Sequence, residues 1–401
     1  MRRRVKITGI GPVTPAGIGR ENFWSGIIEP VSRVRRYSEL GDEFGPFVAA
    51  YIENFDVGKF VSRDRIQKGA SRQSLFAIAG AILALQDAGI RQEELASSNC
   101  AIVVGSSIVD FGSVISSMDA VARHGAHRAK PRTLYTFHPA VIPGGIGDVL
   151  GISARTMNVQ TSCCASMDAI GHAARMVASG EADLALCGGT EAPLHRFPLP
   201  ELRAAGLTPA TDSLPDAVAR PFDLWRTVGV VGEGACMFVI EPESSPRKGY
   251  SYITGYAFAN DDPESVCSGI VTADKMALAA AGLRPKQVEV MVTWGPGHRE
   301  IDAAEAQSIL TVFGDSVSDI AAVSVKGALA VSLGSAPSVD VGVAALSQRN
   351  RLIPPTVNWQ HPDPQCPLNL SAGARAISHE VTLVHSHGVG GLNSSLILER
   401  C

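Results

Sequence analysis

The segment Asn158–Ala174, NVQTSCCASMDAIGHAA, passes from a β-branched strand pattern directly into an Ala-rich helical pattern. It places Cys163 and Cys164 at the expected N-terminus of a helix. The helix dipole and the free N–H groups there favour an anion, so we expect a stabilised thiolate with a lowered pKa. A backbone N–H at such a turn is also free to act as an oxyanion donor. The pattern is equally compatible with two cysteines that only pack against a sheet, as most free cysteines do.

Strand and helix patterns alternate along the whole chain. Strands are expected at Val5–Gly9, Cys100–Gly105, Thr156–Gln160, Asp183–Gly188, Ala235–Glu241, Tyr252–Tyr256, Val288–Thr293, Ala321–Val325, Glu380–His385 and Ser395–Glu399. Helices are expected at Ser71–Ala88, Ala165–Ser179, Ala273–Ala281, Ala303–Val312 and Ser338–Ser347. This alternation favours parallel sheets covered by helices, which is an α/β fold. The strands fall into two groups and predict two similar halves, residues 1–244 and 245–401, that share one core.

The composition excludes several classes of protein. The 401-residue chain has a net charge of −4, which offers no general field for nucleic acid or an acidic membrane surface. Its longest apolar stretch, Leu75–Ala88, is too short to span a bilayer, and no signal-peptide pattern follows the basic N-terminus. The eight cysteines lack C-x-x-C spacing, so neither a metal site nor a disulfide framework is expected. We therefore expect a cytoplasmic protein with reduced thiols.

One region does not fit the alternation of strands and helices. Residues from about 107 to 143 are rich in Ser, His and Pro, and they predict a long irregular insertion. Such insertions usually cover a site or an interface. The histidines within this region, His124, His127 and His138, do not have the spacing of a metal site.

Short motifs along the chain resemble those of the β-ketoacyl synthase family of condensing enzymes. Asn158–Ala174 is similar to the family's active-site stretch and places the family nucleophile on Cys163. Further matches follow in the family's order at Gly180–Asp183, Gly188–Glu191, Arg220–Asp223, Gly232–Ala235 and His387–Asn393. The resemblance covers essentially the whole chain and implies the thiolase-like fold, two pseudo-symmetric halves in five layers (αβαβα). It also implies that Val389, Gly390 and Gly391 form the closing loop, which supplies the second oxyanion N–H.

The resemblance fails at the two histidines that elongating members of the family use together with the cysteine. In the family these histidines polarise the malonyl thioester carbonyl and stabilise the enolate formed by decarboxylation. Asp302 and Glu305 match the acidic residues of the first histidine motif. Counting back from them places Trp294 where the family has its histidine. Lys326 begins the second motif, K-x-x-x-G-H in the family, and Val331 stands at its histidine. An indole offers one hydrogen-bond donor and valine offers none.

Two other histidines are candidates to replace the missing pair. His298 lies four residues after the first lost position, and His387 replaces a family aromatic near the nucleophile. The plainer interpretation of His387 is a loop histidine bonded to backbone. Lys326 has an expected ion-pair partner in Asp340, where the family carries an acidic residue. Such pairs are structural as often as catalytic.

Three functions remain open. The chain is similar to chain-length factors, the non-elongating partners of type II polyketide ketosynthases, although these often carry glutamine where Cys163 stands. It would then shape an acyl tunnel in a heterodimer with a complete ketosynthase. The second function is a ketosynthase-like acyltransferase, a homodimer or a heterodimer, that accepts acyl groups on Cys163. The third is a true condensing enzyme rescued by His298 or His387. Acyl groups would arrive on a phosphopantetheinyl acyl carrier protein, and no other cofactor is expected.

Overall fold

The computed structural model describes residues 3–41, 44–210 and 214–401, and its main elements lie where the sequence predicts them. The strands that follow one another along the main sheet are β1 (Val5–Thr14), β5 (Cys100–Gly105), β6 (Arg155–Val159), β7 (Leu184–Glu191), β8 (Gly234–Pro242), β9 (Ser251–Asn260), β10 (Val290–Val292), β11 (Ala321–Val323), β14 (Val381–Gly388) and β15 (Leu392–Arg400). The helices that cover them are α2 (Arg72–Ala88), α6 (Val141–Leu150), α7 (Ala165–Ser179), α10 (Gly269–Ala281), α11 (Arg299–Phe313) and α13 (Ala336–Asn350).

The remaining elements occupy the connections between these strands and helices. The remaining helices are α1 (Arg20–Ile28), α3 (Gln92–Ser97), α4 (Phe111–His124), α5 (Thr133–Thr136), α8 (Pro198–Ala204), α9 (Pro215–Val218) and α12 (Lys326–Leu329). The short strands are β2 (Gly17–Ile18), β3 (Val34–Tyr37), β4 (Phe47–Ala50), β12 (Leu352–Ile353) and β13 (Arg375–Ala376). Two single turns of 3₁₀ helix matter for the site, η5 (Ser162–Cys164) and η8 (Leu333–Ser335).

The same strand topology occurs twice along the chain. The first half has the strand order β1-β8-β7-β5-β6, and the second half has the order β9-β15-β14-β10-β11. In both halves the last three strands are parallel, and the first two continue the sheet in antiparallel fashion. Pairing of β1 with β9 over Val5–Ile7 joins the two halves through hydrogen bonds. The repeat confirms the expected thiolase-like α/β fold with two pseudo-symmetric halves.

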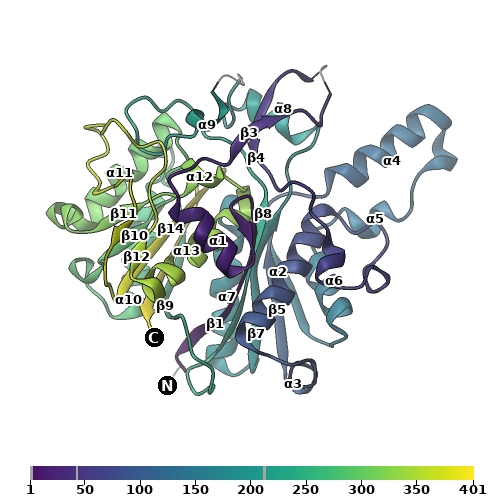
Figure 1. Ribbon diagram of the computed structural model, residues 1–401, viewed down its shortest axis with the longest axis horizontal. Helices are drawn as coiled ribbons and strands as arrows, with labels where there is room; N and C mark the ends of the chain where they lie inside the picture. Colours follow the sequence, from purple (N-terminus) through teal and green to yellow (C-terminus); the bar gives the residue numbers. More distant parts are fainter. Residues whose placement is uncertain (1–2, 42–43, 211–213) are drawn as a thin grey trace.

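Helices form three layers around and between the two halves of the sheet. α2 and α6 pack on the first half, α10 packs on the second half with α11 beside it, and α7 and α13 contact strands of both halves. Figure 1 shows this order, with α10 and α11 on the left, α13 and α7 in the middle, and α2 and α6 on the right. The main apolar core therefore lies around α7 and α13, where residues such as Ile10, Met167 and Val341 are fully buried.

Two glycines set the depth at which α7 lies in this core. A Cβ at Gly171 would lie 2.3 Å from the ring of Tyr256, so only glycine lets the helix pack against β9 there. A Cβ at Gly105, the last residue of β5, would lie 2.3 Å from the backbone of Ala165. The first turn of α7 is thus pressed against the end of a strand. This contact fixes where Cys163, in the turn just before α7, is presented.

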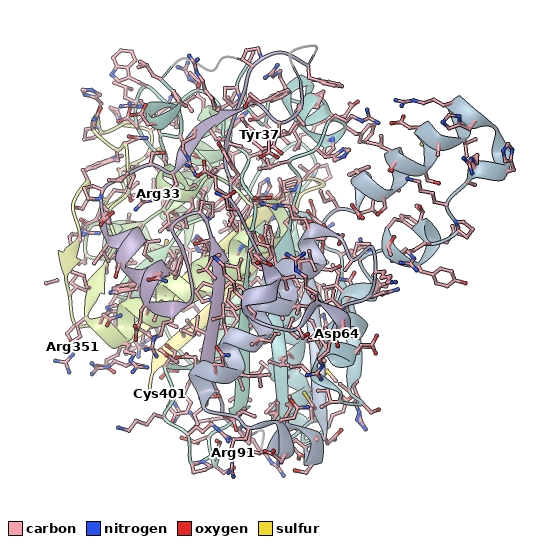
Figure 2. All side chains as sticks on the ribbon, turned by 45° about the vertical axis from the view of Figure 1, so that its right-hand side comes forward. Arg33, Tyr37, Asp64, Arg91, Arg351 and Cys401 are labelled. Carbon is pink, nitrogen blue, oxygen red and sulfur yellow. The ribbon has the colours of Figure 1, made fainter. Side chains whose placement is uncertain are left out.

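The insertion expected to be irregular between residues 107 and 143 contains regular helix, so that expectation is wrong. It forms α4, then α5, and then the start of α6. The helix α4 begins at Asp110, whose side chain accepts a hydrogen bond from the N–H of Ser113. No residue of α4 is fully buried, and Figures 1 and 2 show it projecting from the body of the protein. Pro131 and Pro139 contributed to the prediction of an irregular segment, but both lie beyond the C-terminus of α4.

The cysteines are all free, and seven of the eight are buried. Within the described ranges, no helix is long and apolar enough to cross a membrane. Over the same ranges, no group of three or more His, Cys, Asp or Glu side chains is placed to hold a metal ion.

Candidate functional site

A cavity of about 540 Å³, including the open space at its mouth, lies beside η5, directly before α7. Its wall is formed by Cys163, Leu207, Gly229, Val231, Trp294, Pro296, His298, Ile301, Val331, Leu333, His387 and Val389. Half of these residues are candidates from the sequence: Cys163, Trp294, His298, Val331, His387 and Val389. They come from distant segments, so the fold itself brings them to one cavity.

Cys163 is 9% exposed and lines this cavity. Burial raises the pKa of its thiol to about 11. The Ser162 hydroxyl and the N–H groups of Val389 and of Cys163 itself oppose this rise, while the Glu191 carboxylate adds to it. The expected lowering of the pKa by the helix N-terminus is therefore wrong. The loss of hydration in an apolar wall outweighs the hydroxyl and N–H donors.

Cys164, one residue further along, faces away from the cavity. Its Sγ donates to the carbonyl of Leu392 at 3.3 Å and lies 3.2 Å from the hydroxyl of Ser386. The thiol is fully buried, and burial raises its pKa far above the usual value. Cys164 is thus a packing residue between α7 and the second half of the sheet, and only Cys163 of the pair is available to a ligand.

Trp294 and Val331 form the apolar wall opposite the nucleophile position. Both are buried, and they pack in one hydrophobic cluster with Cys163, Leu333 and Ala336. The backbone of Trp294 is fixed, because its N–H donates to Glu305 at 2.7 Å. The N–H of Val331 donates to the carbonyl of Val230 at 2.8 Å.

Lys326 lies behind this wall and does not line the cavity. Its ammonium group forms an ion pair with Asp340 and donates to the carbonyl of Thr293 at 3.2 Å. It also lies 5.2 Å from the centre of the Trp294 ring. Burial raises the pKa of Asp340 to about 6, and the charge of Lys326 opposes the rise. The indole of Trp294 separates this buried charge pair from the ligand space.

The histidine candidates both reach the cavity, from different elements. His298 caps the N-terminus of α11, and its Nδ1 accepts the N–H of Ile301 at 3.5 Å. Burial lowers the pKa of His298. His387 is 8% exposed on β14, and its Nδ1 lies 2.9 Å from Oδ1 of Asn393. The sequence-based alternative of a histidine bonded to backbone does not describe His387, which bonds a side chain.

The closing loop is the tight turn between β14 and β15. Gly390 and Gly391 have φ angles of 94° and 75°, a left-handed conformation that favours glycine. The turn brings the N–H of Val389 towards the sulfur of Cys163 while the Val389 side chain stays 66% exposed. Two backbone N–H groups, from Val389 and Cys163, thus converge on the sulfur of Cys163.

The sequence interpretation missed two kinds of residue at this site. The apolar wall residues, such as Leu207 and Gly229, carry no chemical signature, and only the fold shows that they face the cavity. The second kind is a buried polar group beneath it. His385 Nε2 contacts Asp274 at 3.0 Å, and its Nδ1 lies 3.5 Å from Glu305. Burial alone would lower the pKa of His385, but the two carboxylates raise it to about 10.

Comparison with known proteins identifies the family. The model of the beta-ketoacyl synthase N-terminal domain matches residues 2–245, and the C-terminal domain model matches residues 250–360. The chain is 30% identical to 3-oxoacyl-[acyl-carrier-protein] synthase 2 of Rhizobium meliloti, with 99% of each chain covered. It is 28% identical to the synthase of the same name from Coxiella burnetii, over 100% of this chain and 99% of that one. The solved structure of the ishigamide ketosynthase/chain length factor has a TM-score of 0.92 and 26% identity, with both chains fully covered. This chain belongs to the β-ketoacyl synthase family.

Proposed function

We propose that this chain is a non-condensing member of the family, which pairs with a complete ketosynthase and shapes an acyl tunnel as a chain-length factor does. The observation that carries the proposal is the cavity wall opposite Cys163, in which Trp294 and Val331 stand in place of two histidines. The likeness to the ishigamide ketosynthase/chain length factor over the whole chain supports it.

The chemistry of condensation requires groups that this wall lacks. An enolate formed from a malonyl thioester needs hydrogen-bond donors aimed at its oxygen in a site that excludes water. Opposite Cys163, the side chains of Val331, Leu333 and Ile301 offer only carbon atoms. The nearby ammonium of Lys326 is engaged by Asp340 and lies behind the indole of Trp294. The side chains of Val331, Leu333 and Ile301 can pack against an acyl chain and offer a malonyl carboxylate no hydrogen-bond donor.

The same apolar lining suits a hydrocarbon chain delivered as a thioester. Each CH₂ group removed from water contributes about 0.8 kcal/mol to binding. The Rhizobium and Coxiella relatives are both named 3-oxoacyl-[acyl-carrier-protein] synthase 2. We therefore include a phosphopantetheinyl acyl carrier protein among the partners in the proposal, and no further cofactor.

Co-expression with a complete Cys-His-His ketosynthase from the same organism tests the proposal. We expect a stable heterodimer that extends chains. Val231→Phe, which fills part of the cavity wall, should shorten the products, as read by mass spectrometry of carrier-bound intermediates. The matched control is Val266→Phe at a surface valine that is 51% exposed. No heterodimer, or products of unchanged length, would count against the proposal.

A second candidate function, acyl transfer, is favoured by one observation. The N–H groups of Val389 and Cys163 converge on a thiol that lines the cavity, which is the arrangement needed to accept an acyl group. Incubation of the chain with octanoyl-N-acetylcysteamine should then give an octanoyl adduct by intact-mass analysis. The adduct should be lost in Cys163→Ala and kept in Cys401→Ala, which removes the exposed cysteine. A chain that stays unmodified would restrict the protein to the tunnel-shaping role.

A further inference from the structure

His387 is held against the nucleophile turn by the residues on either side of it in β14. The hydroxyl of Ser386 lies 3.4 Å from the carbonyl oxygen of Cys163. A Cβ added at Gly388 would lie 3.0 Å from the backbone nitrogen of Cys163. His387 and Cys163 line the same cavity. An imidazole thus shares this cavity with a buried thiol, at a position where the resemblance leads us to expect an aromatic ring.

The partners of Asn393 determine which nitrogen of His387 carries the proton. The Asn393 amide nitrogen donates to Oδ1 of Asp261 at 2.7 Å and to the carbonyl of Gly391 at 3.0 Å. These bonds turn its Oδ1, which only accepts, towards Nδ1 of His387 at 2.9 Å. Nδ1 must therefore be the donor, and in the neutral ring Nε2 keeps its lone pair. The neutral ring is a base at Nε2.

Asp261 completes the arrangement behind Asn393. Its carboxylate accepts the N–H groups of Cys267 at 3.1 Å and Gly269 at 2.9 Å, so it is fixed at the start of α10. Its Oδ2 lies 3.9 Å from Nδ1 of His387. A negative charge at this distance stabilises an imidazolium ring without replacing the bond to Asn393. Asp261, Asn393 and His387 thus form a chain of contacts that ends at the cavity.

We propose that Cys163, His387 and Asn393 form a Cys-His-Asn acyl-transfer triad, with Asp261 stabilising the protonated imidazole. The inference rests on the acyl-transfer candidate function and assigns its base. Nε2 of His387 takes the proton from Cys163 as Sγ attacks the thioester carbonyl, and the N–H groups of Val389 and Cys163 bind the oxyanion. The bond from the carbonyl carbon to the leaving sulfur then breaks. The leaving thiolate takes the proton back from the imidazolium and departs as a free thiol.

A base is needed here because the thiol is poorly ionised by itself. With a pKa of about 11 for Cys163, only about one molecule in 10⁴ would hold a thiolate at pH 7. General-base catalysis typically contributes 10²–10⁴-fold, which is about the factor that this burial removes. Acyl transfer by the triad requires no decarboxylation, so it is compatible with the absence of imidazoles at Trp294 and Val331.

The test measures the rate of octanoyl transfer from octanoyl-N-acetylcysteamine to Cys163 by intact mass, between pH 6 and 10. In the wild type we expect the rate to rise less steeply than tenfold per pH unit, because the base takes the proton from the thiol during the attack. In His387→Phe, which restores an aromatic ring, we expect a loss of about 10²-fold or more at pH 7, with the rate rising tenfold per pH unit. His361→Phe is the matched control, since His361 is exposed. In His387→Ala, added imidazole should restore part of the rate.

The outcomes distinguish the acyl-transfer function from the assignment of His387 as its base. If the wild type forms no adduct, both the acyl-transfer function and the triad are overturned. If it forms an adduct and His387→Phe does so at the same rate and with the same pH profile, acyl transfer stands and the triad is overturned. Should His387→Phe fold poorly by circular dichroism, the imidazole rescue of His387→Ala and the conservative His387→Gln provide the same decision. No rescue together with an unchanged pH profile in His387→Gln would also overturn the triad.

Discussion

Cys163 and Lys326 are both buried ionisable side chains near Trp294, but their surroundings differ. Cys163 has mostly carbon atoms around its thiol, and burial raises its pKa to about 11. Lys326 has an ion-pair partner in Asp340 and a carbonyl acceptor in Thr293. At the scale of single residues, the lysine is thus satisfied as a structural group. The cysteine is the group whose reactivity depends on what enters the cavity.

The ion pair gives a stability prediction. Lys326→Met should lower the free energy of unfolding by about 3–5 kcal/mol, because it leaves the carboxylate of Asp340 buried without a partner. The double variant Lys326→Met/Asp340→Leu should recover much of this loss, since it removes both charges. Urea denaturation measures both values. The control is Arg35→Met in the exposed pair with Glu53, which should cost less than about 1 kcal/mol. Equal losses in Lys326→Met and Arg35→Met would contradict the prediction.

At the scale of elements, Glu191 at the end of β7 connects three segments that surround the site. Its carboxylate accepts from the N–H of Ser107 at 2.7 Å, the hydroxyl of Ser106 at 3.0 Å and the N–H of Gly334 in η8 at 3.2 Å. The base of the insertion and the cavity wall at Leu333 are therefore held by one fully buried side chain. Burial raises the pKa of this carboxyl from 4.5 to about 7, although its hydrogen bonds oppose the rise.

This raised pKa predicts a pH-dependent stability. The folded state holds the proton of Glu191 more tightly than the unfolded state does. The contribution of Glu191 to the free energy of unfolding therefore falls as the pH rises from 4.5 through about 7. Over this range, the contribution falls by about 3 kcal/mol. Glu191→Gln resembles the protonated acid and should remove this slope. Urea denaturation at pH 5 and pH 8 measures it, with the wild type losing more stability than the variant. Parallel profiles for the two proteins would show that Glu191 does not titrate in this range.

The insertion shows what sequence patterns indicate at the element scale and what they leave out. The spacing of Phe111, Ile115 and Met118 is that of a helix, and α4 forms there. The Ser, His and Pro content of residues 107–143 favoured an irregular segment instead. Composition averages over a region, whereas the helix depends on the order of residues within it. The apolar spacing is the signal that identifies α4.

At the scale of the whole molecule, the sequence predicts most of the fold and part of the site. The strands of both halves are predicted because they are β-branched runs bounded by glycine, and their order repeats in the two halves of the sheet. The sequence identifies Trp294 and Val331 because charged residues in their motifs fix the alignment with the family pattern. The structure places both in the cavity wall. Leu207 and Gly229 are not found, since apolar residues carry no mark of which cavity they face. The raised pKa of Cys163 is likewise a property of tertiary packing.

Release of CO₂ from malonyl acyl carrier protein by the purified chain tests the central claim, that this family member does not condense, most directly. The measurement compares the wild type with Cys163→Ala, His298→Ala and His387→Ala. We predict no release above the protein-free background in any of them, because Trp294 and Val331 occupy the two positions at which elongating members of the family carry histidine. Release that the wild type supports and that is lost in His298→Ala or His387→Ala would contradict the account and identify a condensing enzyme with a relocated histidine.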